Sequence, residues 1–205
     1  MFKSILAVAA LSVIAVSAQA SVTAGLANQN PTSFIVLSAA DVTGGSLYSG
    51  GSIPGVAAVP HNVTPSKVTV GEWLAAGPGN TNNGGGNAVV DFGTGGTHFV
   101  SFLWGSPDTY NTLVVTEVGG ATSTYTSMNL PLFVYNGNQS FASYVGFTGN
   151  GSSMIQSMTF KSPNHNAFEA SNFSVTTPIP EPETYALMLA GLGAMGFVAR
   201  RRKSV

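Results

Sequence analysis

Residues 97–118 read THFVSFLWGSPDTYNTLVVTEV, two apolar segments on either side of a turn-forming centre. Val, Phe, Thr and Trp favour strands, whereas Gly, Pro, Asp and Asn favour turns. Successive side chains of a strand point to opposite faces, so Val100, Phe102 and Trp104 share one face, which we expect to be buried. The stretch therefore predicts two strands, at 97–104 and 112–118.

The same strand pattern recurs along the chain, and no segment between residues 21 and 177 has the 3.6-residue period of a helix. Short Gly- and Asn-rich segments such as 136–138 separate the later strands and suit tight hairpins. We predict an all-β fold, namely a β-sandwich with jelly-roll-like connections. A β-solenoid, the rival architecture, would need a repeat of fixed period, which the sequence lacks. Further strands are predicted at 34–38, 67–73, 88–92, 122–126, 132–135, 140–148, 155–162 and 167–175, with long loops over 42–60 and 77–87.

Charged residues make up only 7% of the 205 residues, 44% are hydrophobic, and the net charge is −1. Nucleic acid is an unsuitable partner, because such a chain has no basic field to bind phosphates. The absence of Cys excludes disulfides, thiol catalysis and metal sites with Cys ligands. A disordered chain would combine low hydrophobicity with high net charge, so we expect a folded domain.

The first twenty residues have the three parts of a secretory signal peptide. Lys3 supplies a positive charge, residues 5–16 form an apolar core, and Ala18 and Ala20 are the small residues of a cleavage site. The apolar core is shorter than the roughly 20 residues that span a bilayer. We predict that signal peptidase removes residues 1–20 and that the mature chain is exported.

The C-terminal segment has the pattern of a membrane anchor, with a Pro-rich stretch over 177–184, an uncharged apolar stretch over 185–199 and a final basic cluster. A helix over 185–199 would be about 23 Å long, shorter than the hydrocarbon core of about 30 Å. Tyr185 and the long basic side chains extend it at the two interfaces. We predict a transmembrane helix over 185–199 with its basic end in the cytoplasm. The basic cluster consists of Arg200, Arg201, Arg202 and Lys203.

Pro180, Glu181 and Pro182, followed by a Gly-rich apolar segment and a terminal basic cluster, resemble the PEP-CTERM protein-sorting tail. This tail is also called the ice-binding protein C-terminal domain. The resemblance implies export by a Gram-negative bacterium and cleavage near the Pro-Glu-Pro motif by an exosortase, a membrane protease. The protein would be anchored transiently and then reach the cell surface or extracellular matrix. Glu183 departs from the pattern, which more often has a small residue there, and an anchor that is never cleaved is the alternative.

The chain is thus predicted to have three parts: a signal peptide at 1–20, an exported domain at 21–177 and a sorting tail at 178–205. Two segments of the domain, 100–113 and 166–175, also resemble recurrent segments of exosortase-dependent surface proteins. In the second segment Ser171 stands where the family often has Asp. This resemblance implies a fold and a placement at the surface, not an activity.

The exported domain has few residues suited to catalysis. Its three His and six acids lie outside the known nucleophile, metal and phosphate motifs, and the His are too scattered in sequence to indicate zinc. A glycosidase needs two carboxyls about 5–10 Å apart, for which the candidate pairs are Asp91 with Asp108 and Glu117 with Glu169. We expect no enzymatic activity and no cofactor. The His residues are His61, His98 and His165, and the remaining acids are Asp41 and Glu72.

Asp108 and Asn111 form a weak candidate calcium site, because hard cations accept carboxylate, amide and backbone oxygens. The alternative is that both residues cap their turn through hydrogen bonds between side chain and backbone. Both readings place them in the turn between the two strands of residues 97–118.

Two aromatic residues are candidate glycan contacts. Trp73 and Tyr110 could stack on sugar rings if they are exposed, whereas burial in the core is the alternative for each. The alternate Thr of 122–126 have a spacing of about 6.7 Å, which ice-binding surfaces also use, but a single strand does not make an ice-binding plane.

Taken together, the sequence predicts an exported surface or matrix protein with a structural or adhesive role in exopolysaccharide or biofilm. The alternative is a carbohydrate-binding module for the secreted polysaccharide, and a degradative enzyme is a third reading. The expected partners are signal peptidase, the exosortase, the membrane through the C-terminal helix, and extracellular polysaccharide.

Overall fold

The computed structural model describes residues 22–27, 35–62, 67–80, 85–130 and 134–176. Every regular element within these ranges is a strand, so the prediction of an all-β fold is confirmed. Ten strands join one antiparallel sheet and two form a small separate sheet. The strands are β1 (Val22–Leu26), β2 (Val42–Ser49), β3 (His61–Asn62), β4 (Lys67–Val68), β5 (Glu72–Ala76), β6 (Gly85–Asp91), β7 (Phe99–Gly105), β8 (Thr112–Glu117), β9 (Thr122–Thr126), β10 (Ala142–Gly149), β11 (Ile155–Lys161) and β12 (Phe168–Thr176).

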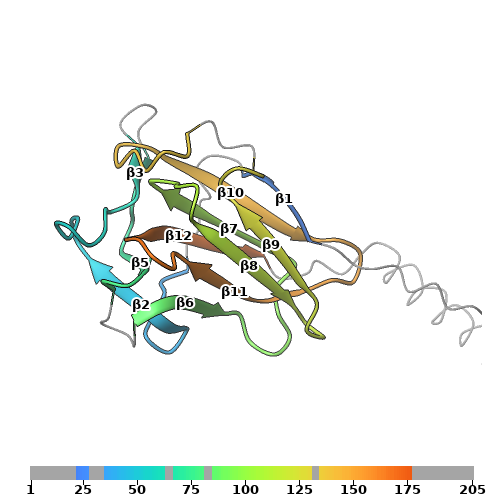
Figure 1. Ribbon diagram of the computed structural model, residues 1–205. Coiled ribbons are helices and arrows are strands. Elements are labelled where there is room, and N and C mark those ends of the chain that lie inside the picture. Colours follow the sequence, from blue (N-terminus) through green and yellow to red (C-terminus); the bar gives the residue numbers. More distant parts are fainter. Residues whose placement is uncertain (1–21, 28–34, 63–66, 81–84, 131–133, 177–205) are drawn as a thin grey trace, which may run out of the picture.

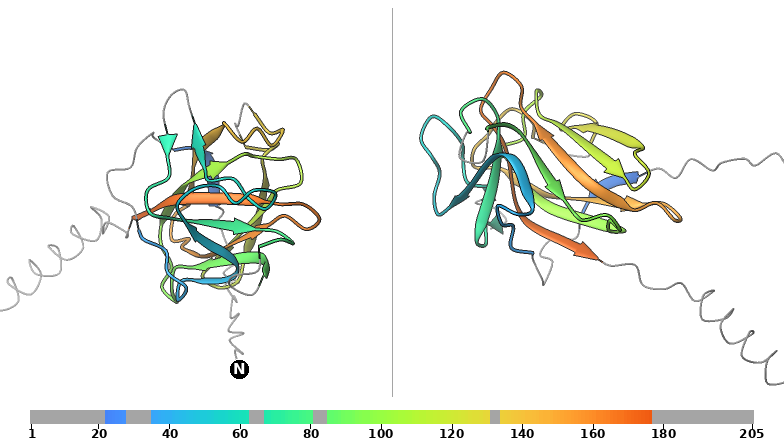
Figure 2. Two further views of the ribbon diagram at one scale, coloured as in Figure 1. Left: turned by 90° about the vertical axis from the view of Figure 1, so that its left-hand side faces the viewer. Right: turned by 90° about the horizontal axis from the view of Figure 1, so that it is seen from below.

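The large sheet curls until it is nearly closed (Figure 1, Figure 2), and we call it the β domain. Its strand order is β1-β10-β7-β12-β5-β2-β6-β11-β8-β9. One half contains β1, β5, β7, β10 and β12, and the other contains β6, β8, β9 and β11. β2 pairs with both β5 and β6, so it joins the two halves into one hydrogen-bonded sheet.

β2 changes partner at Gly44 and Gly45, where its register shifts. Gly45 has a φ of 61°, in the left-handed region that favours glycine. A Cβ at Gly45 would lie 2.6 Å from the Cβ of Ala88 and 2.8 Å from the carbonyl oxygen of Ala75. Glycine at this point therefore allows one strand to serve both halves of the sheet.

The inner core lies between the two halves and is rich in aromatic rings. Phe102 of β7 meets Phe160 of β11 edge to face, with ring centroids 5.3 Å apart. Trp104 stacks on Phe168 at 4.3 Å. Val100, Phe102 and Trp104 are all fully buried in this core, so the prediction that they share one buried face is confirmed.

The strand registers define two ends of the β domain. Val22 begins β1 and Thr176 ends β12, and both lie at the same end, which we call the terminal end. At the opposite end, which we call the loop end, Gly105 pairs with Ala142 on one side and with Glu169 on the other. The right-hand view of Figure 2 shows the start of β1 and the end of β12 at the same end of the domain.

Several parts of the sequence-based assignment differ from the structure. The strand expected over 67–73 is divided at residues 69–71 into β4 and the start of β5, and β6 begins within the loop expected over 77–87. β2 occupies part of the stretch 42–60 that we predicted as a loop, because its Gly pair looks like a turn in the sequence but is a bend within a strand. β1 was not predicted, and residues 35–38 are irregular where a strand was expected over 34–38. Of the strand expected at 132–135, residues 132 and 133 lie outside the described ranges, and residues 134 and 135 are irregular.

The signal peptide at 1–20, including the cleavage site at Ala18 and Ala20, lies outside the described residues, as does the transmembrane helix expected at 185–199. Both stay predictions. In the described part of the chain, no helix has the length and apolar character needed to cross a membrane.

Candidate functional site

A second group of buried side chains lies on the outer faces of β5 and β12. On β5, Leu74 points into the inner core, so its neighbours Trp73 and Ala75 point outward. Residues 50–60, which we call the cover loop, fold over this outer face and exclude water from it. The loop residues that take part in this outer cluster are Ile53, Val56, Ala57 and Val59.

Trp73 has no ring face available to a sugar. It is fully buried, packs against Tyr48 with ring centroids 4.9 Å apart, and donates its Nε1–H to the carbonyl oxygen of Gly50 at 3.1 Å. The structure therefore contradicts Trp73 as a glycan contact and supports the alternative of core packing. The reason is the cover loop, whose position cannot be deduced from the pattern of β5.

Glu169 of β12 is a buried acid beneath the cover loop, with only 3% of its surface exposed. Its Oε1 accepts a hydrogen bond from the backbone N–H of Ala58 at 3.0 Å, and its Oε2 accepts one from the hydroxyl of Ser106 at 2.7 Å. Burial raises the pKa of Glu169 to about 7, although the two hydrogen bonds act to lower it. Near neutral pH the side chain is therefore present in both its protonated and its ionised form.

Asp108 and Tyr110 lie near Glu169 at the loop end, and His165 contacts Tyr110. The hydroxyl of Tyr110 donates to Oδ2 of Asp108 at 2.5 Å, and the Tyr110 ring stacks on His165 at 4.4 Å. Burial, and after it the hydrogen bond to Asp108, raise the pKa of Tyr110. Asp108 also raises the pKa of Glu169, which indicates that the two carboxyls are close enough to interact. Tyr110 is half-buried, with one ring face occupied, and its role as a glycan contact stays a prediction.

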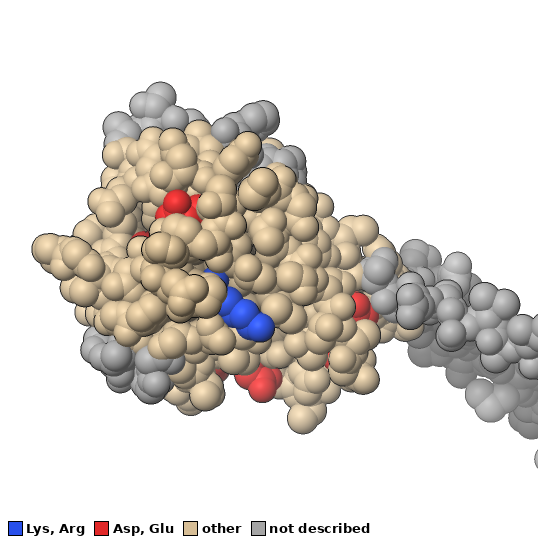
Figure 3. All heavy atoms as spheres, in the orientation of Figure 1, with Lys and Arg blue, Asp and Glu red and all other residues tan. Residues whose placement is uncertain are grey.

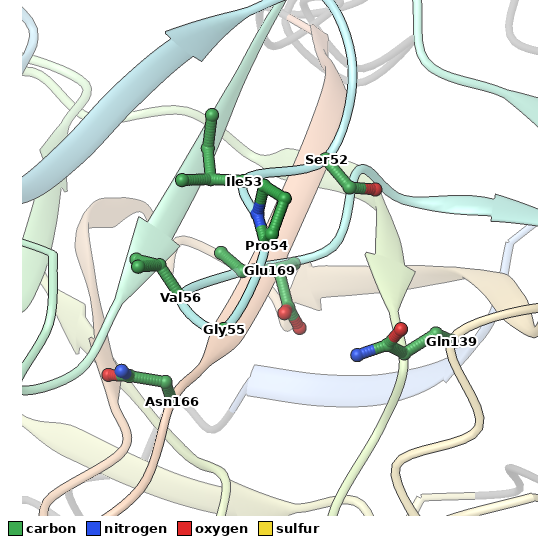
Figure 4. A pocket seen from close by; sticks show the side chains of 9 residues that line it. Ser52, Ile53, Pro54, Gly55, Val56, Gln139, Asn166 and Glu169 are labelled. Carbon is green, nitrogen blue, oxygen red and sulfur yellow. The ribbon is translucent and has the colours of Figure 1, made fainter.

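A pocket of about 310 Å³ opens between the cover loop and β12, and we call it the Glu169 pocket. Figure 4 shows the side-chain amide of Gln139 and the carboxyl of Glu169 directed toward each other. Asn166 lies at the rim, where its Oδ1 accepts a hydrogen bond from the backbone N–H of Gly79 at 2.8 Å. The pocket is lined by residues 52–57 of the cover loop, Gln139, Asn166 and Glu169.

Asp108 and Asn111, the weak candidate calcium site, lie in one turn. The backbone N–H of Asp108 donates to Oδ1 of Asn111 at 2.8 Å, and Nδ2 of Asn111 donates to the carbonyl oxygen of Ala167 at 3.2 Å. These bonds fit the alternative that the two residues cap the turn. Within the ranges given above, no three His, Cys, Asp or Glu side chains come together as metal ligands. A calcium site there stays a prediction.

The two carboxyl pairs considered from the sequence are each divided between the two ends of the domain. Glu117 pairs with Ile155 at the terminal end. Asp91 lies at the same end, because it pairs with Ser157 of β11. Asp108 and Glu169 lie at the loop end. The acidic neighbour of Glu169 is therefore Asp108 and not Glu117.

A second pocket, of about 380 Å³, lies at the terminal end beside Val175 and contains Asp41 and Asp91. Both acids are exposed. Asp41 accepts a hydrogen bond from the backbone N–H of Ser38 at 3.0 Å, and Asp91 accepts one from that of Gly93 at 2.6 Å. These carboxyls stabilise their own turns.

Sequence reasoning treated Glu169 only as half of a carboxyl pair and missed Gln139 and Ser106 as its neighbours. Strand alternation places Phe168 and Ala170 inside the domain and Glu169 outside, which predicts an exposed acid. The apolar residues of the cover loop are the one feature of the sequence that indicates a covered surface, because such residues need a surface to pack against.

Comparison with known proteins identifies the C-terminal segment. No curated protein and no solved structure matches the chain. Residues 178–203 match the PEP-CTERM protein-sorting motif, as the resemblance predicted. The motif implies export, processing by an exosortase and a location at the cell surface. The protein thus carries a PEP-CTERM protein-sorting motif, which begins two residues after the last strand of its β domain.

Proposed function

We propose that this protein has a structural or adhesive role in extracellular polysaccharide or biofilm after its export. The observation that carries the proposal is the sorting motif at residues 178–203. In this proposal signal peptidase removes residues 1–20 of a chain made by a Gram-negative bacterium. The C-terminal segment then anchors the protein in the membrane transiently, until the exosortase cleaves it near Pro180, Glu181 and Pro182.

The arrangement of the two ends supports presentation of the domain away from its attachment point. Val22 and Thr176 both lie at the terminal end, and the sorting motif follows Thr176 closely. The loop end, with the cover loop and the Glu169 pocket, is at the other end of the strands. A tethered or attached protein would therefore direct its loop end outward, toward possible partners.

The surface chemistry also supports residence in hydrated polysaccharide. Residues 21–177 contain two bases, Lys67 and Lys161, and six acids. Charged side chains are sparse on the face seen in Figure 3. Hydration of such a surface depends on hydroxyl and amide groups, which are also the groups that hydrogen-bond to sugars.

We also infer that β5–β12 form a jelly roll. The inference rests on the two sets of neighbours, β5-β12-β7-β10 and β6-β11-β8-β9. The chain crosses from one set to the other at each connection except that between β8 and β9, as expected for two interlocked Greek keys.

We propose further that the protein is not an enzyme. Both carboxyl pairs considered from the sequence are divided between the two ends, and Asp108, the acid close to Glu169, is hydrogen-bonded to Tyr110 and does not line the Glu169 pocket. The second candidate function is that of a carbohydrate-binding module. The specific observation that favours it is the Glu169 pocket, which combines polar groups and apolar loop residues at the outward-facing end.

The sorting proposal is tested by expressing the full chain in an exosortase-containing host and comparing Glu181→Gln with the matched variant Glu183→Gln. The parent and Glu183→Gln should be released with both ends cut, as read by mass spectrometry of the intact protein. Glu181→Gln should accumulate uncut in the membrane fraction. Full-length parent protein in the cytoplasm, with both ends uncut, would overturn the proposal.

A further inference from the structure

We propose that the Glu169 pocket binds one neutral sugar residue of a glycan. This inference rests on the carbohydrate-binding candidate above, to which it adds a site and a class of ligand. It moves the expected contact from Trp73, which is buried, to side chains that the fold brings together from three separate segments.

The pocket has the size of a small-ligand site. Its volume of about 310 Å³ lies at the lower end of the range of roughly 300–1,000 Å³ for pockets that hold small molecules. A single sugar ring or a short saccharide end fits this range better than a long chain lying across a surface. The pocket is therefore suited to a terminal or protruding sugar residue.

The two sides of the pocket match the two kinds of surface on a sugar. Pro54 of the cover loop supplies apolar ring atoms that can contact the C–H groups of a sugar, whereas the side chains of Ile53 and Val56 pack on the outer cluster behind it. Gln139 supplies an amide with both donors and an acceptor, and Glu169 supplies carboxyl oxygens with further acceptor capacity. An amide and a carboxyl that face each other can hydrogen-bond to neighbouring hydroxyls of one ring.

Charge favours a neutral ligand over an acidic one. The residues that line the pocket include no Lys or Arg, and Asp108 lies close enough to Glu169 to raise its pKa. A uronic acid would bring another negative charge beside these carboxyls. A neutral sugar has no such cost, and it can hydrogen-bond to Glu169 in either protonation state.

The cover loop is held in place independently of any ligand. The backbone N–H of Ala58 donates to the carboxyl of Glu169, and that of Val59 donates to the hydroxyl of Ser52 at 3.0 Å. Ile53 and Ala57 also pair as a short antiparallel bridge within the loop. The apolar wall of the pocket is thus preorganised, which lowers the cost of binding.

The test uses the mature protein released by its host and isothermal titration calorimetry with gluco-, galacto- and manno-configured oligosaccharides and with glucuronate-containing ones. Gln139→Ala should weaken binding of the preferred neutral oligosaccharide about three- to tenfold, the effect of one lost neutral hydrogen bond. Gln156→Ala, the same substitution on β11 near the terminal end, should bind as the parent does. Gln139 is exposed, so its substitution should leave the fold intact, which circular dichroism checks.

The outcomes separate the site from the function. Binding of a neutral oligosaccharide that Gln139→Ala weakens and Gln156→Ala does not would support the proposal. Saccharide binding that Gln139→Ala leaves unchanged would overturn the pocket but keep the carbohydrate-binding candidate. Tighter binding of the glucuronate-containing ligands would overturn the neutral class, and binding of none of the ligands would overturn the site and the candidate together.

Discussion

The two pockets of the β domain use acidic side chains in opposite ways. At the terminal end, Asp41 and Asp91 are exposed, and their carboxyls accept hydrogen bonds from the backbone of their own turns. At the loop end, Glu169 is buried under a loop from a distant part of the chain, and its pKa is raised to about 7. The exposed Asp41 and Asp91 stabilise their own turns, whereas the buried Glu169 makes stability depend on pH.

The largest expected effect concerns the outer cluster that buries this acid. Trp73→Ala should lower the free energy of unfolding by about 3–5 kcal/mol, because it removes a fully buried indole and leaves a cavity under the cover loop. Urea unfolding measures this. Met128→Ala, at a side chain that is 62% exposed, should change stability by less than about 0.5 kcal/mol. A loss below about 1 kcal/mol for Trp73→Ala would mean that the cover loop does not pack as described.

The second prediction concerns the pH dependence of stability. The pKa of Glu169 is raised in the folded state, from 4.5 to about 7, so the folded state binds the proton more tightly than the unfolded chain does. The resulting stabilisation, about 3 kcal/mol, is fully present below pH 4.5 and is lost as the pH rises through 7.

Glu169→Gln should remove this part of the pH dependence, whereas Glu72→Gln, at an exposed acid of β5, should keep it. Urea unfolding at several pH values from 4 to 8.5 gives the comparison. Equal slopes for the parent and Glu169→Gln would contradict the assignment of the raised pKa to this residue.

A smaller effect is expected at the terminal end. The hydroxyl of Tyr125 donates to the carbonyl oxygen of Val22 at 2.5 Å and ties β1 to the domain. Tyr125→Phe should lower stability by about 1 kcal/mol and speed hydrogen exchange in β1, because one hydrogen bond is lost. Tyr135→Phe, at an exposed ring, serves as the control. Unchanged exchange in β1 would show that this bond does not hold the strand.

The smallest effect is expected from calcium. Because the amide of Asn111 is already bonded within the fold, millimolar calcium should shift the thermal unfolding midpoint by less than about 1 °C. A larger rise that Asp108→Asn abolishes would instead support the calcium site.

The later part of the fold could be predicted because its signals are local. Thr122–Thr126 is a strand as predicted, and β8, β11 and β12 begin or end within one residue of the predicted bounds. Alternating apolar residues and Gly- or Asn-rich turns act over a few neighbouring residues. β2 could not be found in this way, since it is a strand only because β5 and β6 lie on either side of it.

The candidate site was less predictable, because it too depends on contacts between distant segments of the chain. Asp108 and Asn111 lie three residues apart, and their capping geometry was among the sequence-based alternatives. Glu169, Gln139 and the cover loop are far apart in the sequence and meet only in the folded domain.

The sequence alone determined the all-β class, the buried face of residues 100–104 and the sorting motif at the C-terminus, because periodicity and short motifs are properties of neighbouring residues. The tertiary structure alone decided that the outer face of β5 is covered, that Trp73 is buried and that Glu169 lies in a pocket. Burial depends on which distant segment covers a surface, and strand alternation indicates only which side of the sheet a residue faces.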